Sequence, residues 1–159
     1  MNCAICGENT LKRFIKKSDL VLVRCCNCGF VQADKLLEGF DISNYDYYKK
    51  RITLKKEDIY NPLTTKRYSA ILKRLECARK NNSLLDIGCG EGHFLSLARK
   101  SGWNADGIDK VAYAVEVCKK FNIRNVICND FLDVEIAHAQ YDVIVMFEVL
   151  EHLTEPRQY

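Results

Sequence analysis

From Ser83 onward, short apolar runs alternate with segments in which apolar residues recur every three or four positions. The runs have the length of strands, and the last of them, YDVIVMFEV, is apolar enough to predict a fully buried strand. Strands that alternate with helices of this length predict right-handed crossovers and a parallel sheet. The predicted strands are 84–88, 103–109, 125–128 and 141–149, and the predicted helices are 92–102 and 111–122.

A further helix is predicted before the first of these strands. Its apolar positions have the i, i+3, i+4, i+7 spacing of an amphipathic helix. Pro62 suits the first turn of this helix, and the pair Asn81–Asn82 suits its end. The apolar positions are Tyr68, Ile71, Leu72 and Leu75.

Composition divides the chain into three regions. Residues 1–35 hold five of the nine cysteines together with two β-prone runs, LVLVRC and GFVQA. Residues 36–61 are a polar stretch rich in tyrosine and lysine, and residues 62–159 carry the alternating pattern. We therefore expect a small N-terminal domain, a connector and an α/β domain.

Charge is unevenly divided along the chain. Residues 1–83 have a net charge of +8 and residues 84–159 a net charge of −5, within +3 overall. The basic half would attract a polyanion or a phosphorylated substrate. The alternative, which is commoner for stretches of like charge, is that these side chains only solvate exposed helix faces. No apolar run approaches the ~20 residues that cross a bilayer, and MNCAICGENT does not resemble a secretory signal. We expect a cytoplasmic protein without a membrane partner.

Four cysteines have the spacing of a metal site. Cys3 and Cys6 form one C-x2-C pair, Cys25 and Cys28 form a second, and each pair is followed by glycine. Four thiolates close a tetrahedral shell with no open position, which predicts a structural Zn²⁺ site in a zinc ribbon. An iron site with the same ligands is the chemical alternative, and a cluster of reduced cysteines without metal is the other.

The stretch LLDIGCGEGHF, residues 84–94, has three glycines within five positions at the end of a predicted strand. Gly88, Gly90 and Gly92 let the backbone turn tightly and approach a ligand where the next helix begins. The spacing differs from the G-x-G-x-x-G of dinucleotide-binding folds, and alone it also fits a tight turn without any ligand.

Acidic residues follow the strands near this turn. Asp109 comes 19 residues after Gly90, close to the ~20-residue offset at which a carboxylate meets ribose hydroxyls. Asp130, next to Phe131, places an acceptor beside an apolar face, which suits the exocyclic amine and ring of a purine. Asp86, just before the glycines, can accept from an amine. Acids at the ends of three successive strands favour a nucleoside-binding site, whereas any one of them alone would more often be a helix cap.

Four stretches of the chain, taken in their order along the sequence, resemble the successive cofactor-binding motifs of class I S-adenosylmethionine-dependent methyltransferases. The resemblance rests on LLDIGCGEGHF, ADGIDK, NDF and YDVIVMFEVLEHLTEP, and it covers about residues 62–159. It implies a Rossmann-like α/β fold whose sheet usually has seven strands. Because only four strands are predicted before Tyr159, we expect the N-terminal half of that sheet, preceded by a small zinc ribbon with four cysteine ligands. An incomplete sheet would also expose an edge that favours association.

The resemblance implies roles for single residues in binding S-adenosylmethionine. The glycine turn would contact the methionine part, Asp109 the ribose, and Asp130 with Phe131 the adenine, while Phe147 and Glu148 would lie near the sulfonium. The implied cofactor-binding residues are Asp86, Gly88, Cys89, Gly90, Gly92, Asp109, Asp130, Phe131 and Phe147.

The sequence FEVLEHL predicts a catalytic cluster. A helix that began at Glu148 would present Glu151 and His152 on the same face, at i+3 and i+4. Methyl transfer is an in-line displacement that depends mainly on alignment, but an oxygen or acidic-carbon acceptor also needs a base, a role that suits His152. The other interpretation is that Glu151 and His152 only cap and solvate the next helix.

We therefore expect S-adenosylmethionine-dependent methyl transfer to a small molecule. The N-terminal ribbon and the YDYYKK segment resemble those of bacterial and archaeal methyltransferases of sugar and surface-glycan biosynthesis, which favours a nucleotide-linked sugar or another glycan precursor. Tyr45, Tyr47 and Tyr48 would then stack on a base or sugar, or else belong to a partly buried connector. One alternative is an RNA methyltransferase that binds RNA through the ribbon and Lys49–Lys56. Another is an inactive module that holds zinc and cofactor.

Overall fold

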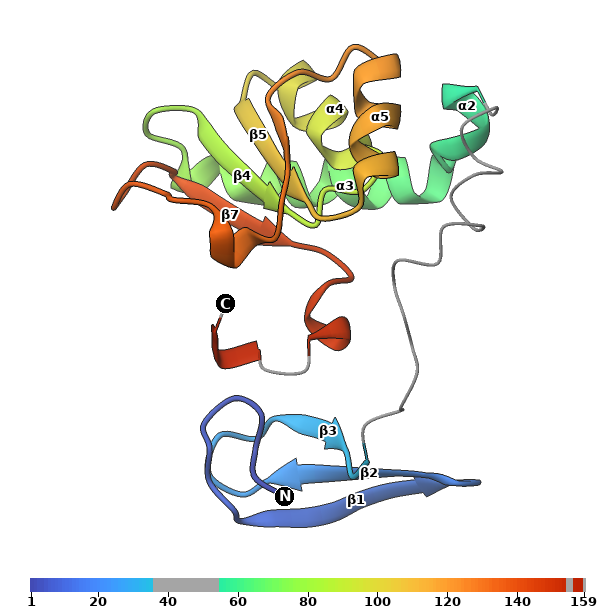
Figure 1. Ribbon diagram of the computed structural model, residues 1–159, viewed down its shortest axis with the longest axis vertical. Helices are drawn as coiled ribbons and strands as arrows, with labels where there is room; N and C mark the ends of the chain where they lie inside the picture. The colour runs from blue at the N-terminus through green and yellow to red at the C-terminus, as the bar shows by residue number, and fades with distance from the viewer. Residues whose placement is uncertain (36–54, 154–155, 159) are drawn as a thin grey trace. The chain divides into compact units, whose positions relative to one another are not determined.

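The structure, a computed structural model, describes residues 1–35, 55–153 and 156–158. The chain divides into two compact units, the first formed by 1–42 with 152–159 and the second by 43–151 (Figure 1). The predicted tyrosine-rich segment, Tyr45, Tyr47 and Tyr48, lies outside the described residues, as does most of Lys49–Lys56. Within the described ranges, no helix is long and apolar enough to cross a membrane.

The first unit contains an antiparallel sheet in the order β1-β2-β3. Its strands are β1 (Leu11–Lys17), β2 (Leu20–Cys25) and β3 (Val31–Ala33). The second and third strands were predicted, but β1 was not. Four of the seven residues of β1 are basic and six are exposed, so no face of the strand carries the apolar alternation by which a strand is recognised.

The second unit is built on a four-stranded sheet in the order β6-β5-β4-β7, in which every pair of neighbours is parallel. All four predicted strands are present, and the α/β class is confirmed. Strand order reverses beside β4, and in open α/β sheets ligands bind at such a reversal, outside the carboxyl ends of the strands. The strands are β4 (Ser83–Ile87), β5 (Asn104–Asp109), β6 (Val126–Cys128) and β7 (Val143–Met146).

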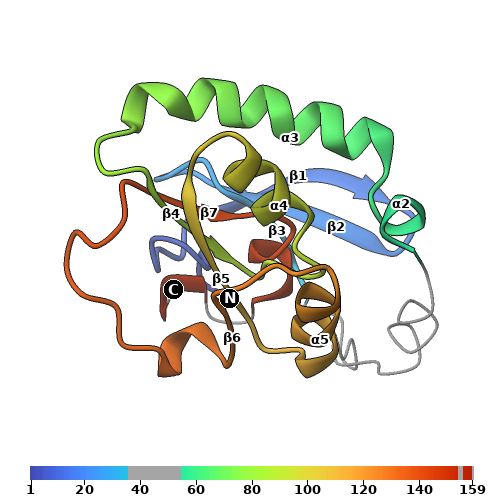
Figure 2. The same cartoon turned by 90° about the horizontal axis from the view of Figure 1, so that it is seen from above.

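Three longer helices cover one face of this sheet (Figure 2). The first of them begins as predicted, with Pro62 in its first turn and the Asn61 side chain accepting a hydrogen bond from the Leu63 N–H at 2.8 Å. It ends at Leu75, before the predicted Asn81–Asn82, and a 3-10 turn follows. The helices are α3 (Pro62–Leu75), α4 (His93–Lys100) and α5 (Ala112–Lys120), preceded by the short α2 (Lys56–Ile59).

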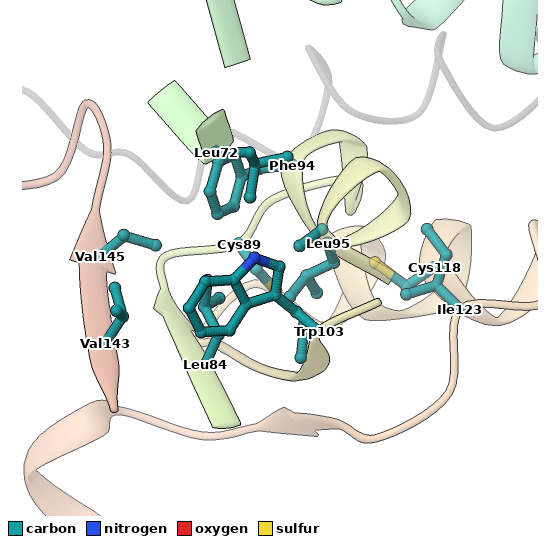
Figure 3. Close-up of a cluster of buried hydrophobic side chains, with 12 residues drawn as sticks. Leu72, Leu84, Cys89, Phe94, Leu95, Trp103, Cys118, Ile123, Val143 and Val145 are labelled. Carbon is teal, nitrogen blue, oxygen red and sulfur yellow. The ribbon is translucent and has the colours of Figure 1, made fainter. Parts of the chain in front are cut away.

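The main core lies between the helices and the sheet (Figure 3). Leu84 of β4 and Leu95 of α4 are fully buried there, and the side chain of Trp103 is 2% exposed. Alternate strand residues form a second cluster on the opposite face, which the segment 131–141 helps to cover. The apolar run of β4 is therefore explained by burial on both faces of a parallel strand.

The prediction that 141–149 is a fully buried strand is wrong in its bounds and in its burial, because the strand comprises only Val143–Met146 and one of its four residues is exposed. Val143 and Val145 face the main core, but the side chain of Ile144 is 54% exposed. Ile144 pairs in register with Leu85, whose side chain belongs to the second cluster, so Ile144 lies on that face of the sheet. Its strand is at an edge of the described sheet, where segment 131–141 does not cover Ile144.

Candidate functional site

The glycine turn joins β4 to α4, and its glycines serve different purposes. Gly92 has φ of +74°, and a Cβ there would lie 2.5 Å from Ile123 Cδ1 and 2.8 Å from Cys118 Sγ. This glycine is required by packing. Gly90 has φ of +52°, and a Cβ there would meet no atom within 4 Å. The space beside Gly90 is therefore open, as expected if a ligand approaches the backbone at that point.

The carboxylate of Asp109, at the end of β5, is fixed against this turn. Its Oδ2 accepts a hydrogen bond from the Gly90 N–H at 2.8 Å, and its Oδ1 accepts one from the Val111 N–H at 2.8 Å. Burial raises the pKa of Asp109, although the two N–H groups and the nearby Lys110 charge act in the opposite direction. Each carboxylate oxygen can accept more than one hydrogen bond, so Asp109 keeps capacity for two ribose hydroxyls.

Asp86, at the end of β4, is the only charged side chain that is buried in the described part of the chain, and it is 2% exposed. Burial, and then the negative charge of Asp109, raise the pKa of Asp86 well above its ordinary value. An ionised carboxylate in such a place is unfavourable until an opposite charge joins it. The site is therefore suited to a cationic ligand.

The buried carboxyl group predicts a pH dependence of stability without ligand. A carboxyl whose pKa is raised by folding binds more protons in the folded than in the unfolded state above pH 3.8, so stability falls as pH rises toward the folded pKa. We expect Asp86→Asn to remove this part of the slope. The measurement is urea unfolding of both proteins at several pH values; identical slopes would contradict the prediction.

Residues of α3 and the preceding loop also contact the turn, although no pattern in the sequence predicted a role for them in the site. The Tyr60 hydroxyl donates to the Glu91 carbonyl at 3.0 Å, and the Tyr60 ring stacks on His93 with 4.2 Å between ring centroids. His93 Nε2 is 2.8 Å from Thr65 Oγ1. Tyr68, predicted only as an apolar helix position, packs against the ring of Phe147 at 5.3 Å.

The structure corrects the geometry predicted for the catalytic cluster. Glu148 has φ of +54°, in the left-handed region, so no helix begins there and the three side chains do not share one helix face. The exposed Glu148 carboxylate lies 3.6 Å from Arg67 of α3. Glu151 and His152 belong to a separate 3-10 turn, Leu150–His152. Glu151 is assigned to the second unit and His152 to the first. Their catalytic roles remain predictions.

The predicted adenine site lies after β6. The Asp130 carboxylate accepts a hydrogen bond from the Leu132 N–H at 3.2 Å and caps the short 3-10 helix Phe131–Asp133. Phe131 is half-buried against the second core cluster. Capping is thus one observed role of Asp130, and adenine binding stays a prediction.

Cys89 belongs to the glycine turn, and its side chain is buried against Gly107 of β5.

The four predicted metal ligands come together in the first unit. The backbone folds alike around both pairs, since the Gly7 N–H donates to the Cys3 carbonyl at 2.9 Å and the Gly29 N–H donates to the Cys25 carbonyl at 3.0 Å. Backbone N–H groups also point at sulfur, and the pKa of Cys3 is lowered chiefly by the N–H of Cys6.

The sulfur atoms have a spacing that fits a tetrahedral metal. All four Sγ atoms of the cluster lie within 4.8 Å of one another, and Cys3–Cys28 and Cys6–Cys25 are each 3.5 Å apart. A Zn–S bond of about 2.3 Å in a tetrahedron requires sulfurs about 3.8 Å apart. Only small shifts would therefore be needed for the cluster to hold zinc.

Comparisons with known proteins agree with this geometry. Residues 60–159 match a protein family described as "Methyltransferase domain". The ubiquinone biosynthesis O-methyltransferase of Actinobacillus pleuropneumoniae is 34% identical over 83 residues, which cover 46% of this chain and 36% of that protein. The enzyme of the same name from Saccharophagus degradans is 33% identical over 104 residues, which cover 62% of this chain and 42% of that protein. The chain thus matches less than half the length of these curated relatives.

Solved structures share the fold. The plantazolicin methyltransferase BpumL, in complex with a pentazolic desmethyl analogue and SAH (S-adenosylhomocysteine), has a TM-score of 0.53 at 29% identity, covering 72% of this chain and 47% of that one. The DhpI-SAM-HEP complex has a TM-score of 0.52 at 21% identity, covering 78% of this chain and 58% of that one. At this identity the likeness shows a shared fold and nothing about function. The family match spans the glycine turn, Asp86 and Asp109, and the chain belongs to the methyltransferase domain family.

Proposed function

We propose that the second unit binds S-adenosylmethionine and transfers its methyl group to a small molecule. The observation that carries this proposal is the turn itself, where the space beside Gly90 is open and the Gly90 N–H fixes the Asp109 carboxylate. The buried Asp86 adds a negative charge, which a sulfonium and an α-ammonium would complement. The family match supports the same interpretation.

Catalysis in this proposal depends on alignment. Phe147 and Glu148 directly follow β7, which pairs with β4, the strand that leads into the glycine turn. We propose that these two residues border the sulfonium. An acceptor with an oxygen or an acidic carbon must lose a proton, and we propose His152 as the base with Glu151 beside it. Most of the rate enhancement would come from placing acceptor and methyl group in line.

The acceptor we propose is a small molecule, and more narrowly a nucleotide-linked sugar or another glycan precursor. Support for the broader class comes from relatives named for ubiquinone biosynthesis and for plantazolicin methylation. Support for the narrower class is the resemblance of the N-terminal cysteine ribbon to ribbons of sugar methyltransferases. Methylation assays with nucleotide sugars and with RNA would separate this acceptor from the RNA alternative.

We also propose that the cysteine cluster holds one Zn²⁺ ion. The four thiolates would occupy every coordination position, which leaves none for a substrate or a water molecule. When bound, the metal would cross-link the two cysteine-containing turns of the first unit and stabilise its sheet. No catalytic step depends on it.

Asp109 provides the direct test of cofactor binding. Asp109→Ala should weaken binding of S-adenosylmethionine and S-adenosylhomocysteine by about 1–3 kcal/mol, because it loses charge-assisted hydrogen bonds and loosens the turn. Isothermal calorimetry measures the change, with the exposed Glu116→Ala as the matched acidic control. Binding of NAD or ATP, with neither of these compounds, would refute the proposal.

A further inference from the structure

The proposed metal centre has an excess of negative charge. Four thiolates carry four negative charges and Zn²⁺ carries two positive ones, so two negative charges remain on the loaded cluster. Backbone N–H groups compensate in part, since the N–H of Cys6 is directed at the Cys3 sulfur and the N–H of Glu8 at the Cys6 sulfur. Groups around the ligands tune the affinity of metal sites. A cationic side chain beside the cluster would therefore strengthen metal binding.

Arg157 places a guanidinium on the first of the two cysteine turns. Gly7 directly follows the ligand Cys6 in this turn and has φ of +80°. A Cβ on Gly7 would lie 2.6 Å from Arg157 Nη1 and 3.5 Å from its Cζ, so the guanidinium rests against the backbone of the turn. Arg157 belongs to the 3-10 helix Pro156–Gln158, and residues 152–159 are assigned to the same unit as the cysteines. The contact therefore lies within the first unit.

The second cysteine turn provides an internal comparison. Gly29 follows the ligand Cys28 and has nearly the same backbone conformation as Gly7, with φ of +77°. A Cβ on Gly29 would meet no atom within 4 Å. Among the described residues, the first turn thus has a cationic side chain at this position and the second turn has none. The contact of Arg157 is not a general consequence of how such a turn folds.

The charge of Arg157 is available to the cluster. The residue is exposed, and in the part of the chain that the structure describes it forms no ion pair with a carboxylate. Arginine keeps its positive charge at every pH at which the thiolates bind metal. Attraction between a cation and an anionic centre needs no direct hydrogen bond, although salt screens it.

We propose that Arg157 is an electrostatic partner of the loaded metal centre and holds the 3-10 helix Pro156–Gln158 on the first cysteine turn. The inference rests on the proposed zinc site. Arg157 stays outside the coordination shell, which the four sulfurs fill. Because coupling between two binding events is reciprocal, zinc must favour docking of this 3-10 helix by the factor by which Arg157 raises zinc affinity. Zinc uptake therefore also fixes residues 156–158 to the ribbon.

The test measures Zn²⁺ affinity of the full chain by competition with a chromophoric chelator. Arg157→Ala should weaken zinc about tenfold, and Arg157→Lys, which keeps the charge, should lose less than about threefold. Gln158→Ala, an exposed neighbour in the same 3-10 helix, is the control and should change the affinity less than about twofold. Raising the salt from about 0.05 M to about 0.5 M should shrink the difference between wild type and Arg157→Ala, because the interaction is Coulombic.

The two glycines give a second, independent measurement. Gly7→Ala and Gly29→Ala both place an L-residue in the left-handed region, so both carry the same backbone cost. The methyl group on residue 7 would also displace the guanidinium, so Gly7→Ala should weaken zinc about tenfold more than Gly29→Ala. In an Arg157→Ala background the two glycine variants should have equal affinities, which a double-mutant cycle tests.

Unchanged zinc affinity in Arg157→Ala would overturn the inference and leave the zinc site intact. A loss that neither lysine nor salt alters would also overturn it, because the role of Arg157 would then be packing. Wild-type protein that binds no metal would instead overturn the zinc site, and the inference with it. Amide NMR spectra of the zinc-loaded variants confirm that the compared proteins are folded.

Discussion

Replacing Cys25 with serine is expected to abolish metal binding and unfold the first unit. Cys25 is buried, supplies one of the four clustered sulfurs and ends β2. A structural zinc site of this kind contributes about 10–16 kcal/mol of apparent binding free energy, which is also folding free energy. The short, largely exposed sheet of this unit offers little buried apolar surface to compensate.

The adjacent Cys26 makes a closely matched control. Its side chain is exposed and it lies outside the cluster, so Cys26→Ser should keep the metal and the fold. Elemental analysis should give about one zinc per chain in wild type and Cys26→Ser, and none in Cys25→Ser; backbone amide NMR reports the fold. Wild-type protein without any metal would contradict the site, whereas iron would preserve its geometry and change the assigned ion.

Gly92→Ala is expected to lower the free energy of unfolding of the second unit by about 2–5 kcal/mol. A left-handed backbone costs an L-residue about 1–2 kcal/mol, and forcing a methyl group into a packed core costs about 1–3 kcal/mol more. The added Cβ would press on Ile123 and Cys118, which join α5 and its following loop to the turn.

Gly90→Ala should behave differently although it lies two residues away. It carries the backbone cost of about 1–2 kcal/mol alone, because nothing surrounds the added methyl group. The methyl group would, however, occupy the space proposed for the cofactor, so binding of S-adenosylhomocysteine should be lost. Urea unfolding and calorimetry on both variants separate the effects; equal destabilisation, or normal binding by Gly90→Ala, would contradict this account.

The sequence predicted the parallel sheet, the glycine turn and the cysteine cluster because each has a local signature. Alternating strand and helix periods identify β4 to β7, and Cys3, Cys6, Cys25 and Cys28 have a spacing that few other structures share. Asp109 was likewise found from its offset after Gly90, and its hydrogen bond to that residue's N–H is observed.

Other features depend on contacts between distant residues and leave no local pattern. Periodicity could not show that Arg67 and Tyr68 reach the end of β7, since their partners are about 80 residues away. The exposure of Ile144 depends on what covers the second face of the sheet, and apolar character alone does not reveal it. The left-handed conformation of Glu148 likewise prevents the helix that was predicted to begin at that residue, and helix propensity alone does not reveal it.

Trp103 gives the protein a built-in optical reporter. It is the single tryptophan of the chain, lies in the main core of the second unit, and has the Arg79 guanidinium 4.3 Å from its ring. Residues 1–35 contain neither tryptophan nor tyrosine, so they are almost silent in near-ultraviolet emission. Indole fluorescence therefore follows melting of the methyltransferase core alone, and a chelator can be titrated against it to learn whether the two units unfold together or separately.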